Sequence, residues 1–460
     1  MADQVVARCV DHIDTLPQQP LYGVHEAERV CQTLREASPA DATPLASLLD
    51  DLFTTCIPQS FNTPHPGYLA YIPGGGLYTA ALADFIANTV NRYTGIWQAA
   101  PALVQLEANA LEWLREWMRM PVGTTGVFTT GGSMATFNAV LCAREQYLGV
   151  DIRRGVLYTS DQAHHCVIKS AKLAGIMPDR VRSVATDARF HIRMDLLQEA
   201  VARDRRDGLT PFMLVGNAGT TNTGAVDPLD ALADLSESED LWFHIDGAYG
   251  AFFQLCEETR VVLRGIERAD SLTLDPHKGM FLPYGTGALL VRDGARLRAA
   301  HEATADYLPE MPSPAEFYDP SQHGPDLSRG FPGLRMWLTM KLFGADAFRS
   351  AITEKRALAV DAATRVAALP NVAMDAPPEL SLFPFHITWP GATLAEEDLA
   401  TRAVMDETSR RGRVMVSGAV AGGRYVGRVC VLSFRTHAPQ IDALVEDLSA
   451  TIQDVVRRFS

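Results

Sequence analysis

Lysine is rare in this chain, which narrows any chemistry that needs a primary amine. Only five of the 41 Lys+Arg residues are lysines: Lys169, Lys172, Lys278, Lys341 and Lys355. Arginine keeps its proton in proteins and cannot replace them. Lys278 alone stands in a turn after an apolar segment, where burial lowers a lysine's pKa and favours attack on a carbonyl carbon. The sequence therefore favours Lys278 for amine chemistry over the alternative of a surface lysine in a turn.

The segment Gly131-Gly132-Ser133 lies between an apolar segment and a helical stretch. Glycine allows close backbone approach, and a helix N-terminus offers free N–H groups to an anion. These residues therefore form either a phosphate site or a plain strand-to-helix turn. They also nearly match the nucleophile elbow of a serine hydrolase, but Ala135 replaces the last glycine and no Asp and His follow in the expected setting.

Asp246 ends a third apolar segment, in His244-Ile245-Asp246. Such an aspartate is either a helix cap or a catalytic carboxylate. Alternate strand residues share one face, so His244 and Asp246 could also hold a metal, but further ligands at suitable spacing are missing. His164-His165-Cys166 are adjacent and point in different directions. We therefore expect no metal site.

These candidates follow strand-like segments that alternate with helical ones between residues 100 and 300. The apolar segments are 127–130, 156–159, 212–215, 241–245, 271–274 and 287–291. Such alternation predicts an α/β fold with a mainly parallel sheet covered by helices on both faces. Function in this architecture lies at the carboxyl ends of the strands.

The sequence divides into four regions. Residues 1–50 predict an N-terminal helical arm, and residues 51–300 the large α/β domain. Residues 301–333, rich in proline and glycine, predict a long mobile loop of the kind that is usually functional. Residues 334–460 predict a small α+β domain with strands near 382–389, 413–417 and 429–434.

Composition excludes several classes of protein. The 460 residues are 47% hydrophobic with a net charge of −14, which indicates a globular protein and argues against a nucleic-acid partner. The seven scattered cysteines form no CxxC pair and predict reduced thiols. The longest apolar stretch is interrupted by Asp84 and Asn88, and no secretory signal is evident. We expect a cytoplasmic protein without a membrane partner.

A phosphate-binding turn, a strand-end carboxylate and a strand-end lysine are together what pyridoxal 5'-phosphate (PLP) requires. With these residues in place, the chain resembles the group II PLP-dependent amino-acid decarboxylases, which include aromatic-L-amino-acid and glutamate decarboxylases. The resemblance runs from about His65 to Phe434. The matching stretches are His65–Tyr71, Leu82–Asp84, Ala100–Ala102, Leu106–Glu107, Thr130–Thr136, Asp161–His164, Ala218–Thr221, His244–Tyr249 and Asp275–Lys278.

The resemblance implies a PLP-dependent transferase-like fold of type I, with a seven-stranded, mainly parallel sheet and a small C-terminal domain. It implies that Lys278 forms the Schiff base with PLP, that Asp246 pairs with the pyridine nitrogen, and that His164 stacks on the ring opposite Ala248. It further implies a phosphate site at Gly132, Ser133, Met134 and His277, with Thr221 near the ring oxygen.

Residues 302–330 resemble the catalytic lid of the family. This lid carries a tyrosine that protonates the reaction intermediate. Tyr318 is our candidate and Tyr307 the reserve. Tyr71, Ile72 and Trp97 fall in segments that are expected to bind substrate. Arg428 either meets a carboxylate or forms a structural ion pair. The chain departs from the family at Gly279, where an aromatic residue is common, and in the glycine-rich segment 72–76, which could reshape the pocket.

These expectations predict the PLP-dependent decarboxylation of an L-amino acid, with an aromatic or large apolar side chain favoured, to an amine and carbon dioxide. The alternatives keep the cofactor but give decarboxylative aldehyde formation or another carbon–carbon cleavage. A non-catalytic PLP-binding protein and, more remotely, a serine hydrolase are the other readings. Because related enzymes are dimers, we expect a homodimer to which the N-terminal arm contributes.

Overall fold

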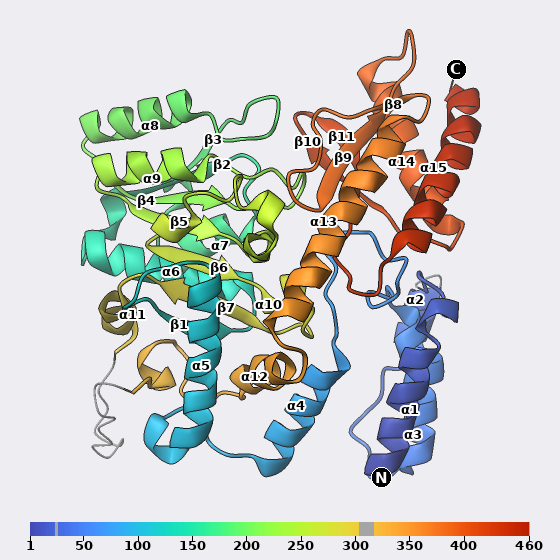
Figure 1. Ribbon diagram of the computed structural model, residues 1–460, viewed down its shortest axis with the longest axis horizontal. Coiled ribbons are helices and arrows are strands. Elements are labelled where there is room, and N and C mark those ends of the chain that lie inside the picture. Colours follow the sequence, from blue (N-terminus) through green and yellow to red (C-terminus); the bar gives the residue numbers. More distant parts are fainter. Residues whose placement is uncertain (24–25, 303–316, 460) are drawn as a thin grey trace. The chain divides into compact units, whose positions relative to one another are not determined.

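The computed structural model describes residues 1–23, 26–302 and 317–459 (Figure 1). The chain divides into two compact units. The large unit comprises residues 74–359 and 375–383, and the small unit comprises residues 1–73, 360–374 and 384–460.

This division differs from the expected boundaries near the start of the C-terminal region. Helix α12 (Pro332–Phe343) and the first part of α13 (Ala345–Ala367) belong to the large unit. The reason is that α12 packs against α4 (Tyr78–Val90) and α5 (Pro101–Trp117). Side-chain packing between helices distant in the sequence therefore sets this boundary.

A seven-stranded sheet forms the centre of the large unit. Its strands are β1 (Thr125–Thr129), β2 (Gly155–Ser160), β3 (Val181–Val184), β4 (Thr210–Asn217), β5 (Trp242–Asp246), β6 (Ser271–Leu274) and β7 (Gly287–Val291). They lie in the order β1-β7-β6-β5-β4-β2-β3, and β7 runs antiparallel to both of its neighbours. The other pairs are parallel, which confirms the predicted α/β fold with a mainly parallel sheet.

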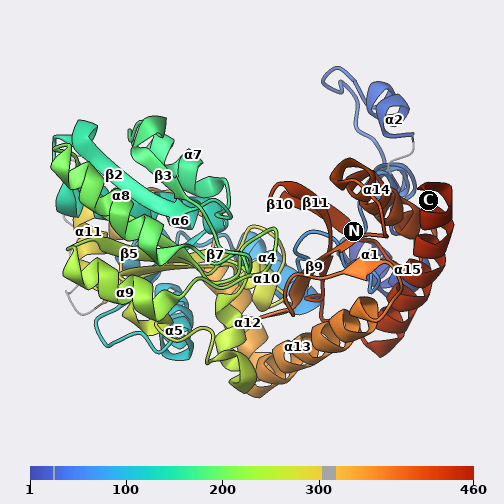
Figure 2. The ribbon, with the colours of Figure 1, turned by 90° about the horizontal axis from the view of Figure 1, so that it is seen from above.

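Helices cover the sheet. Helices α6 (Gly132–Tyr147), α7 (Cys166–Leu173) and α11 (Gly294–His301) pack together, as do α8 (Met194–Arg206) and α9 (Leu229–Ser238). Figures 1 and 2 show α8 and α9 side by side along the sheet. Strands β2, β5, β6 and β7 are buried along their whole length, as expected for a sheet covered on both faces.

The parallel strands bring the predicted site residues to one edge of this sheet. Strands β5 and β6 are neighbours and run in the same direction, so Asp246 and the turn after Leu274 lie at the same end. Strand β2 leads at that end to His164, and β4 leads to Thr221. Parallel strand order therefore gathers residues that are far apart in the sequence.

The small unit contains a second sheet, with strand order β10-β11-β9-β8. Its strands are β8 (Val372–Ala373), β9 (Leu382–Ile387, of which residues 384–387 lie in this unit), β10 (Ser417–Ala421) and β11 (Arg424–Cys430). Helices α14 (Leu394–Arg410) and α15 (Ala438–Phe459) follow β9 and β11 in the chain. The N-terminal residues form α1 (Ala2–Asp14), α2 (Ala27–Thr33) and α3 (Leu45–Asp51). No helix in the described ranges is long and apolar enough to cross a membrane.

Candidate active site

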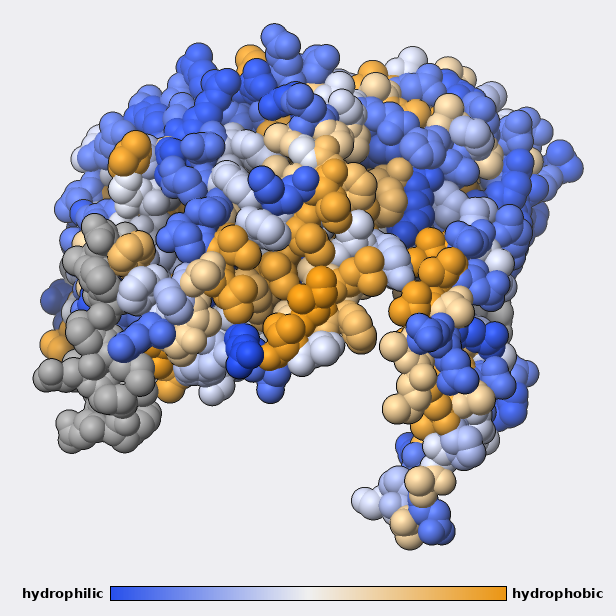
Figure 3. All heavy atoms as spheres, turned by 60° about the horizontal axis from the view of Figure 1, so that its bottom comes forward, coloured by the Kyte–Doolittle hydropathy of each residue, from blue (hydrophilic) through white to orange (hydrophobic). Residues whose placement is uncertain are grey.

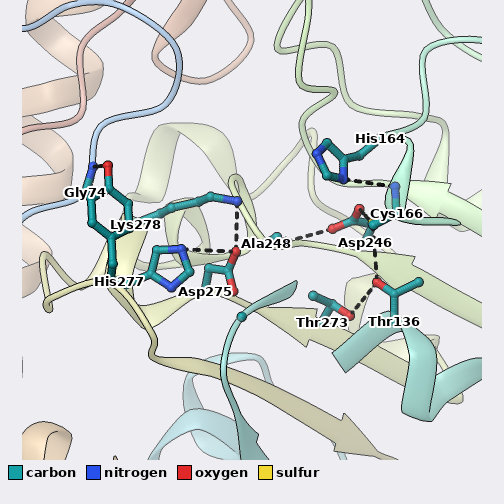
Figure 4. A network of polar contacts seen from close by, with 12 residues as sticks. Gly74, Thr136, His164, Cys166, Asp246, Ala248, Thr273, Asp275, His277 and Lys278 are labelled. Atoms are coloured by element: carbon teal, nitrogen blue, oxygen red, sulfur yellow. Dashed lines mark hydrogen bonds and ion pairs between the residues drawn. The ribbon is translucent and has the colours of Figure 1, made fainter. Parts of the chain in front are cut away.

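Lys278 lies in the short helix α10 (Pro276–Gly279), directly after β6. Its Nζ is 2.8 Å from Oδ2 of Asp275, and His277 Nε2 is 3.6 Å from the same oxygen. Figure 4 shows the Lys278 side chain extending past Asp275 toward the part of the site that holds Asp246 and His164. The turn therefore joins an amine and a carboxylate at the carboxyl edge of the sheet.

The electrostatic setting of Lys278 differs from the one expected from the sequence. Burial alone would lower its pKa, but the nearby carboxylates of Asp275 and Asp246 outweigh burial and raise the pKa above its usual value. The expectation of a lowered pKa was wrong for the chain without cofactor, because it neglected the aspartate three residues earlier on the same turn.

Asp246 is the last residue of β5, and its carboxylate is buried. Oδ1 accepts a hydrogen bond from the backbone N–H of Ala248 at 3.1 Å, and Oδ2 is 3.9 Å from Sγ of Cys166. The charge of Asp246 acts on both Lys278 and His164, so these three groups share one electrostatic environment. The structure thus brings together the three residues expected at the centre of the site.

His164 lies between β2 and α7, with a half-buried imidazole. Its Nδ1 accepts a hydrogen bond from the backbone N–H of Cys166 at 3.2 Å. Burial lowers the pKa of His164, and the charge of Asp246 opposes that shift only in part. A neutral ring held by one nitrogen suits stacking on a planar ligand.

The first turn of α6 holds Gly132, Ser133 and Met134, as the phosphate-site hypothesis requires. A Cβ on Gly132 would lie 3.1 Å from Ala248 Cβ and 3.1 Å from Asp275 Oδ2. Any side chain at this position would therefore crowd the site. The Ser133 side chain is exposed, and among the hydrogen bonds of the described residues none joins it to a histidine, which leaves the hydrolase reading without support.

Two further residues of the expected phosphate and ring sites lie at the same edge. Nδ1 of His277 is 2.8 Å from the carbonyl oxygen of Thr286, and burial lowers the pKa of its imidazole. Thr221 is half-buried in the turn after β4.

The glycine at position 279, where the family commonly has an aromatic residue, has a steric explanation, because a Cβ there would lie 2.5 Å from Cβ of Phe252. Phe252 thus fills the space next to Lys278, so this departure from the family does not enlarge the pocket at that point.

The predicted substrate residues fall in both units. Trp97 belongs to the large unit, where its ring stacks on Phe317 with centroids 4.7 Å apart. Tyr71, Ile72 and Arg428 belong to the small unit. Within it, Arg428 is buried in β11 and Nη2 is 3.5 Å from the carbonyl oxygen of Tyr71. The ring of Tyr71 is half exposed and its backbone has a φ of +52°, an uncommon value for tyrosine.

The candidates for the lid tyrosine have different outcomes. Tyr307 lies outside the described residues. Tyr318 is half-buried, with its hydroxyl buried next to the ion pair of Glu107 and Arg329, and its ring centroid is 5.0 Å from that of His323. Burial, followed by the charge of Glu107, raises the pKa of Tyr318. None of its described contacts involves Lys278.

Sequence reasoning missed Asp275 and Cys166 as members of the site. Asp275 could have been recognised because residues three apart on a helical turn are neighbours, which places it beside Lys278. Cys166 carries no such signal, since its contact with Asp246 spans 80 positions in the sequence.

The residues at this edge fit PLP. An amine, a carboxylate beside a planar half-buried ring, and the N-terminus of a 16-residue helix meet the three demands of the cofactor. Oδ1 of Asp275 is buried and has no hydrogen-bond partner among the described residues, and a Cβ on Gly131 would contact this oxygen at 4.0 Å and Cε1 of His277 at 3.5 Å. The orphaned oxygen is therefore available to a polar ligand, and a side chain in place of Gly131 would lie against it.

Comparisons with known proteins agree with this chemistry. The family model described as "Pyridoxal-dependent decarboxylase conserved domain" matches residues 28–388. The aromatic-L-amino-acid decarboxylase of Bacillus atrophaeus is 32% identical over 98% of this chain and 95% of its own length. The crystal structure of Oryza sativa TDC with PLP and tryptamine superposes with a TM-score of 0.93 at 27% identity, covering 98% of this chain and 97% of that one.

A protein with a different product also matches. The 4-hydroxyphenylacetaldehyde synthase of Rhodiola rosea is 25% identical with a TM-score of 0.91, covering 99% of this chain and 97% of its own. The breadth of the family match, together with a strand-end lysine and carboxylate at one sheet edge, leads to one conclusion: the chain belongs to the pyridoxal-dependent decarboxylase family.

Proposed function

We propose that this protein is a PLP-dependent carboxy-lyase that converts an L-amino acid with an aromatic or other large apolar side chain to the amine and carbon dioxide. The observation that carries the proposal is the placement of the Lys278 amine at the sheet edge that also holds Asp246 and His164. The aromatic preference is supported by the names of the relatives and by the tryptamine bound in the rice protein.

The residues divide the work in a chemically consistent way. PLP, when bound, supplies a ring that withdraws electrons from the substrate carbon that loses carbon dioxide. Lys278 would hold the cofactor covalently after passing its proton to a base, and Asp246 would keep the pyridine nitrogen protonated. The neutral His164 ring would stack against the cofactor, and the N–H groups of Gly132, Ser133 and Met134 would face its phosphate.

Each unit offers its own candidates for contact with a substrate, Trp97 in the large unit and Tyr71, Ile72 and Arg428 in the small unit. Trp97 offers a flat surface that is already stacked on Phe317. Tyr71 and Ile72 would add further apolar contact area, and the buried Arg428 would meet a carboxylate.

Aldehyde formation is the second candidate, because one of the matched structures is an aldehyde synthase. Both reactions release carbon dioxide from the same substrates. The products separate them, since decarboxylation leaves the amine whereas the alternative gives an aldehyde with ammonia.

The experiment is to purify the protein with PLP, record its absorption spectrum, and incubate it with each of the twenty amino acids while carbon dioxide and product mass are followed. We expect a yellow protein that releases the amine from tryptophan, tyrosine or phenylalanine. A colourless protein that binds no PLP would refute the proposal, and aldehyde with ammonia would establish the second candidate.

Lysine variants provide the matched controls. Lys278→Ala should lose the absorption band that borohydride bleaches, because no other lysine stands at this sheet edge. Lys172→Ala removes an exposed lysine of α7 and should leave the spectrum unchanged.

We also propose that the protein is a homodimer through the exposed apolar face of α4 and α12. This face carries Phe85, whose exposed fraction is 58%, together with Ile86, Val90, Leu342 and Phe343. Figure 3 shows a broad hydrophobic area on the large unit, on the side where these helices lie in Figure 1. A contiguous group of exposed apolar side chains often marks a protein–protein interface. Light scattering should give twice the chain mass, and Phe85→Glu should shift the measured mass toward that of the monomer.

A cytoplasmic location stays a prediction from the scattered cysteines.

A further inference from the structure

A series of buried polar side chains runs beneath the candidate site, beginning at Trp242 in β5. The indole Nε1 of Trp242 donates to Oγ of Ser271 at 2.7 Å. The same oxygen is 2.8 Å from Nδ1 of His244, and Nε2 of His244 is 3.3 Å from Oγ1 of Thr273. Strands β5 and β6 therefore supply the first half of a continuous path.

The path continues to the carboxylate of Asp246. Oγ1 of Thr273 is 3.4 Å from Oγ1 of Thr136, which is 3.8 Å from Sγ of Cys166. Sγ is in turn 3.9 Å from Oδ2 of Asp246. Figure 4 shows Thr136, Cys166 and Asp246 in one part of the site. All members of the path are buried, so water does not compete for these hydrogen bonds.

The two ends of the path fix its direction. Tryptophan only donates, and a carboxylate only accepts. Burial lowers the pKa of His244 to about 4, so its ring is neutral at pH 7 and has one donor and one acceptor nitrogen. Each hydroxyl in between can then accept from the Trp242 side and donate toward Asp246. The single thiol hydrogen of Cys166 can reach either Oγ1 of Thr136 or Oδ2 of Asp246, and this direction gives it to the carboxylate while Thr136 donates to the sulfur. The thiol of Cys166 is the last donor.

The opposite direction satisfies fewer groups. Ser271 would accept from both Trp242 and His244, and its own hydrogen would have no acceptor among the side-chain hydrogen bonds of the described residues. Cys166 would give its only hydrogen to Thr136 and turn a sulfur lone pair toward Oδ2 of Asp246. Buried polar groups that lose a partner cost free energy, so the direction toward Asp246 is preferred.

We propose that Cys166 and His244 are positioning residues for Asp246, the thiol donating to Oδ2 and the histidine, as its Nε2–H tautomer, maintaining the direction of the chain. The inference rests on the proposed function, because Asp246 would act on the pyridine nitrogen of PLP. It assigns to Cys166 a role that depends on its hydrogen and not on its volume. A loosened Asp246 would pair less well with the ring nitrogen, which alters both the affinity for PLP and its absorption spectrum.

The test compares three cysteine variants with PLP bound. Cys166→Ala should weaken PLP binding about three- to tenfold, the range of one modest hydrogen bond, and should change the absorption spectrum of the bound cofactor. Cys166→Ser keeps a donor and should stay within about twofold of the wild type. Cys142→Ala removes another buried cysteine, on α6, and should also stay within about twofold. Equal effects of Cys166→Ala and Cys142→Ala, or no effect of Cys166→Ala, would overturn the inference.

A second measurement does not depend on the cofactor. The ring ¹⁵N shifts of His244 in the cofactor-free protein report its tautomer. Nε2–H supports the inference and Nδ1–H overturns it, whether or not the protein binds PLP. If the wild type binds no PLP, the proposed function fails while the tautomer still decides whether the chain of hydrogen bonds exists.

Discussion

Two buried ion pairs of the large unit have the same charges but different surroundings. Lys278 and Asp275 lie at the carboxyl edge of the sheet, and Arg329 and Glu107 join the segment before α12 to α5. The exposed fractions of the side chains are 22% for Lys278 and 3% for Asp275, against 8% for Arg329 and 1% for Glu107. The lysine pair is therefore partly open to ligands, whereas the arginine pair is closed.

The carboxylates of the two pairs also differ in their hydrogen bonds. The second carboxylate oxygen of Glu107 accepts from the backbone N–H of Gly333 at 3.2 Å, while Oδ1 of Asp275 is buried without a partner in the part of the chain that the structure describes. A guanidinium also keeps its proton, whereas a lysine amine can release it. An ion pair can therefore take part in a reaction when its cation is an amine that can lose its proton and when one oxygen of its carboxylate is left without a hydrogen bond.

The largest expected effect comes from replacing Lys278, the cation of the open pair with Asp275, by arginine, the cation of the closed pair of Arg329 and Glu107. Lys278→Arg keeps the charge beside Asp275 but removes the amine that PLP requires. We expect decarboxylation to fall by at least about a thousandfold with little change in thermal stability, because the loss is chemical. Product formation and a melting curve measure the two effects. Lys172→Arg, on the exposed face of α7, is the control, and substantial activity in Lys278→Arg would contradict the assignment.

The second prediction removes the cation of the closed pair of Arg329 and Glu107. Arg329→Leu leaves the Glu107 carboxylate buried without its cation, and such a loss costs about 3–5 kcal/mol in the free energy of unfolding. Chemical denaturation measures it. Arg349→Leu removes an arginine from an exposed ion pair with Asp346 and should cost less than about 1 kcal/mol. Equal losses in the two variants would show that the buried pair of Arg329 and Glu107 stabilises the fold no more than an exposed ion pair does.

The fold was predicted where strands are apolar. The segments 271–274 and 287–291 coincide with β6 and β7. Strand β3 was missed because Val181-Arg182-Ser183-Val184, at the edge of the sheet, has no apolar run. In the small unit, the expected strand at 413–417 was wrong, since β10 begins at Ser417. Its hairpin partner begins after Gly422 and Gly423, both with positive φ, and a turn of this kind sets strand register where apolar pattern does not.

The site was predictable as far as its chemistry is tied to residue type. Lys278, Asp246 and His164 could be chosen because few residues can act as an amine, a carboxylate or a planar ring at strand ends. The partners of these groups could not be chosen, since the neighbours of Asp246 depend on how α7 packs against α6. Asp275 also reversed the expected pKa shift of Lys278, an effect of charge separation that spacing alone does not quantify.

A third prediction removes the charge from the open pair. In Asp275→Asn, the carboxylate that most strongly opposes the effect of burial is lost, so the pKa of Lys278 falls. A lower pKa leaves the amine neutral at lower pH, so the pH midpoint for borohydride trapping of PLP on Lys278 should move down. Asp161→Asn changes an exposed aspartate and should leave the midpoint in place. An unchanged or raised midpoint in Asp275→Asn would show that Asp275 does not control the amine.

The smallest expected effect concerns Tyr318, which lies beside the closed pair. Its hydroxyl is buried beside Arg329 and makes no hydrogen bond of normal geometry with the described residues, so Tyr318→Phe should change the free energy of unfolding by less than about 1 kcal/mol. Because its described contacts are with the arginine pair and His323, we expect the rate of amine formation to stay within about twofold, a small fraction of what general acid catalysis contributes. A hundredfold loss, or a switch from amine to aldehyde, would instead assign Tyr318 the proton transfer predicted from the sequence. The Tyr318→Phe variant therefore decides whether the residues around Arg329 and Glu107 only stabilise the fold or also take part in the reaction.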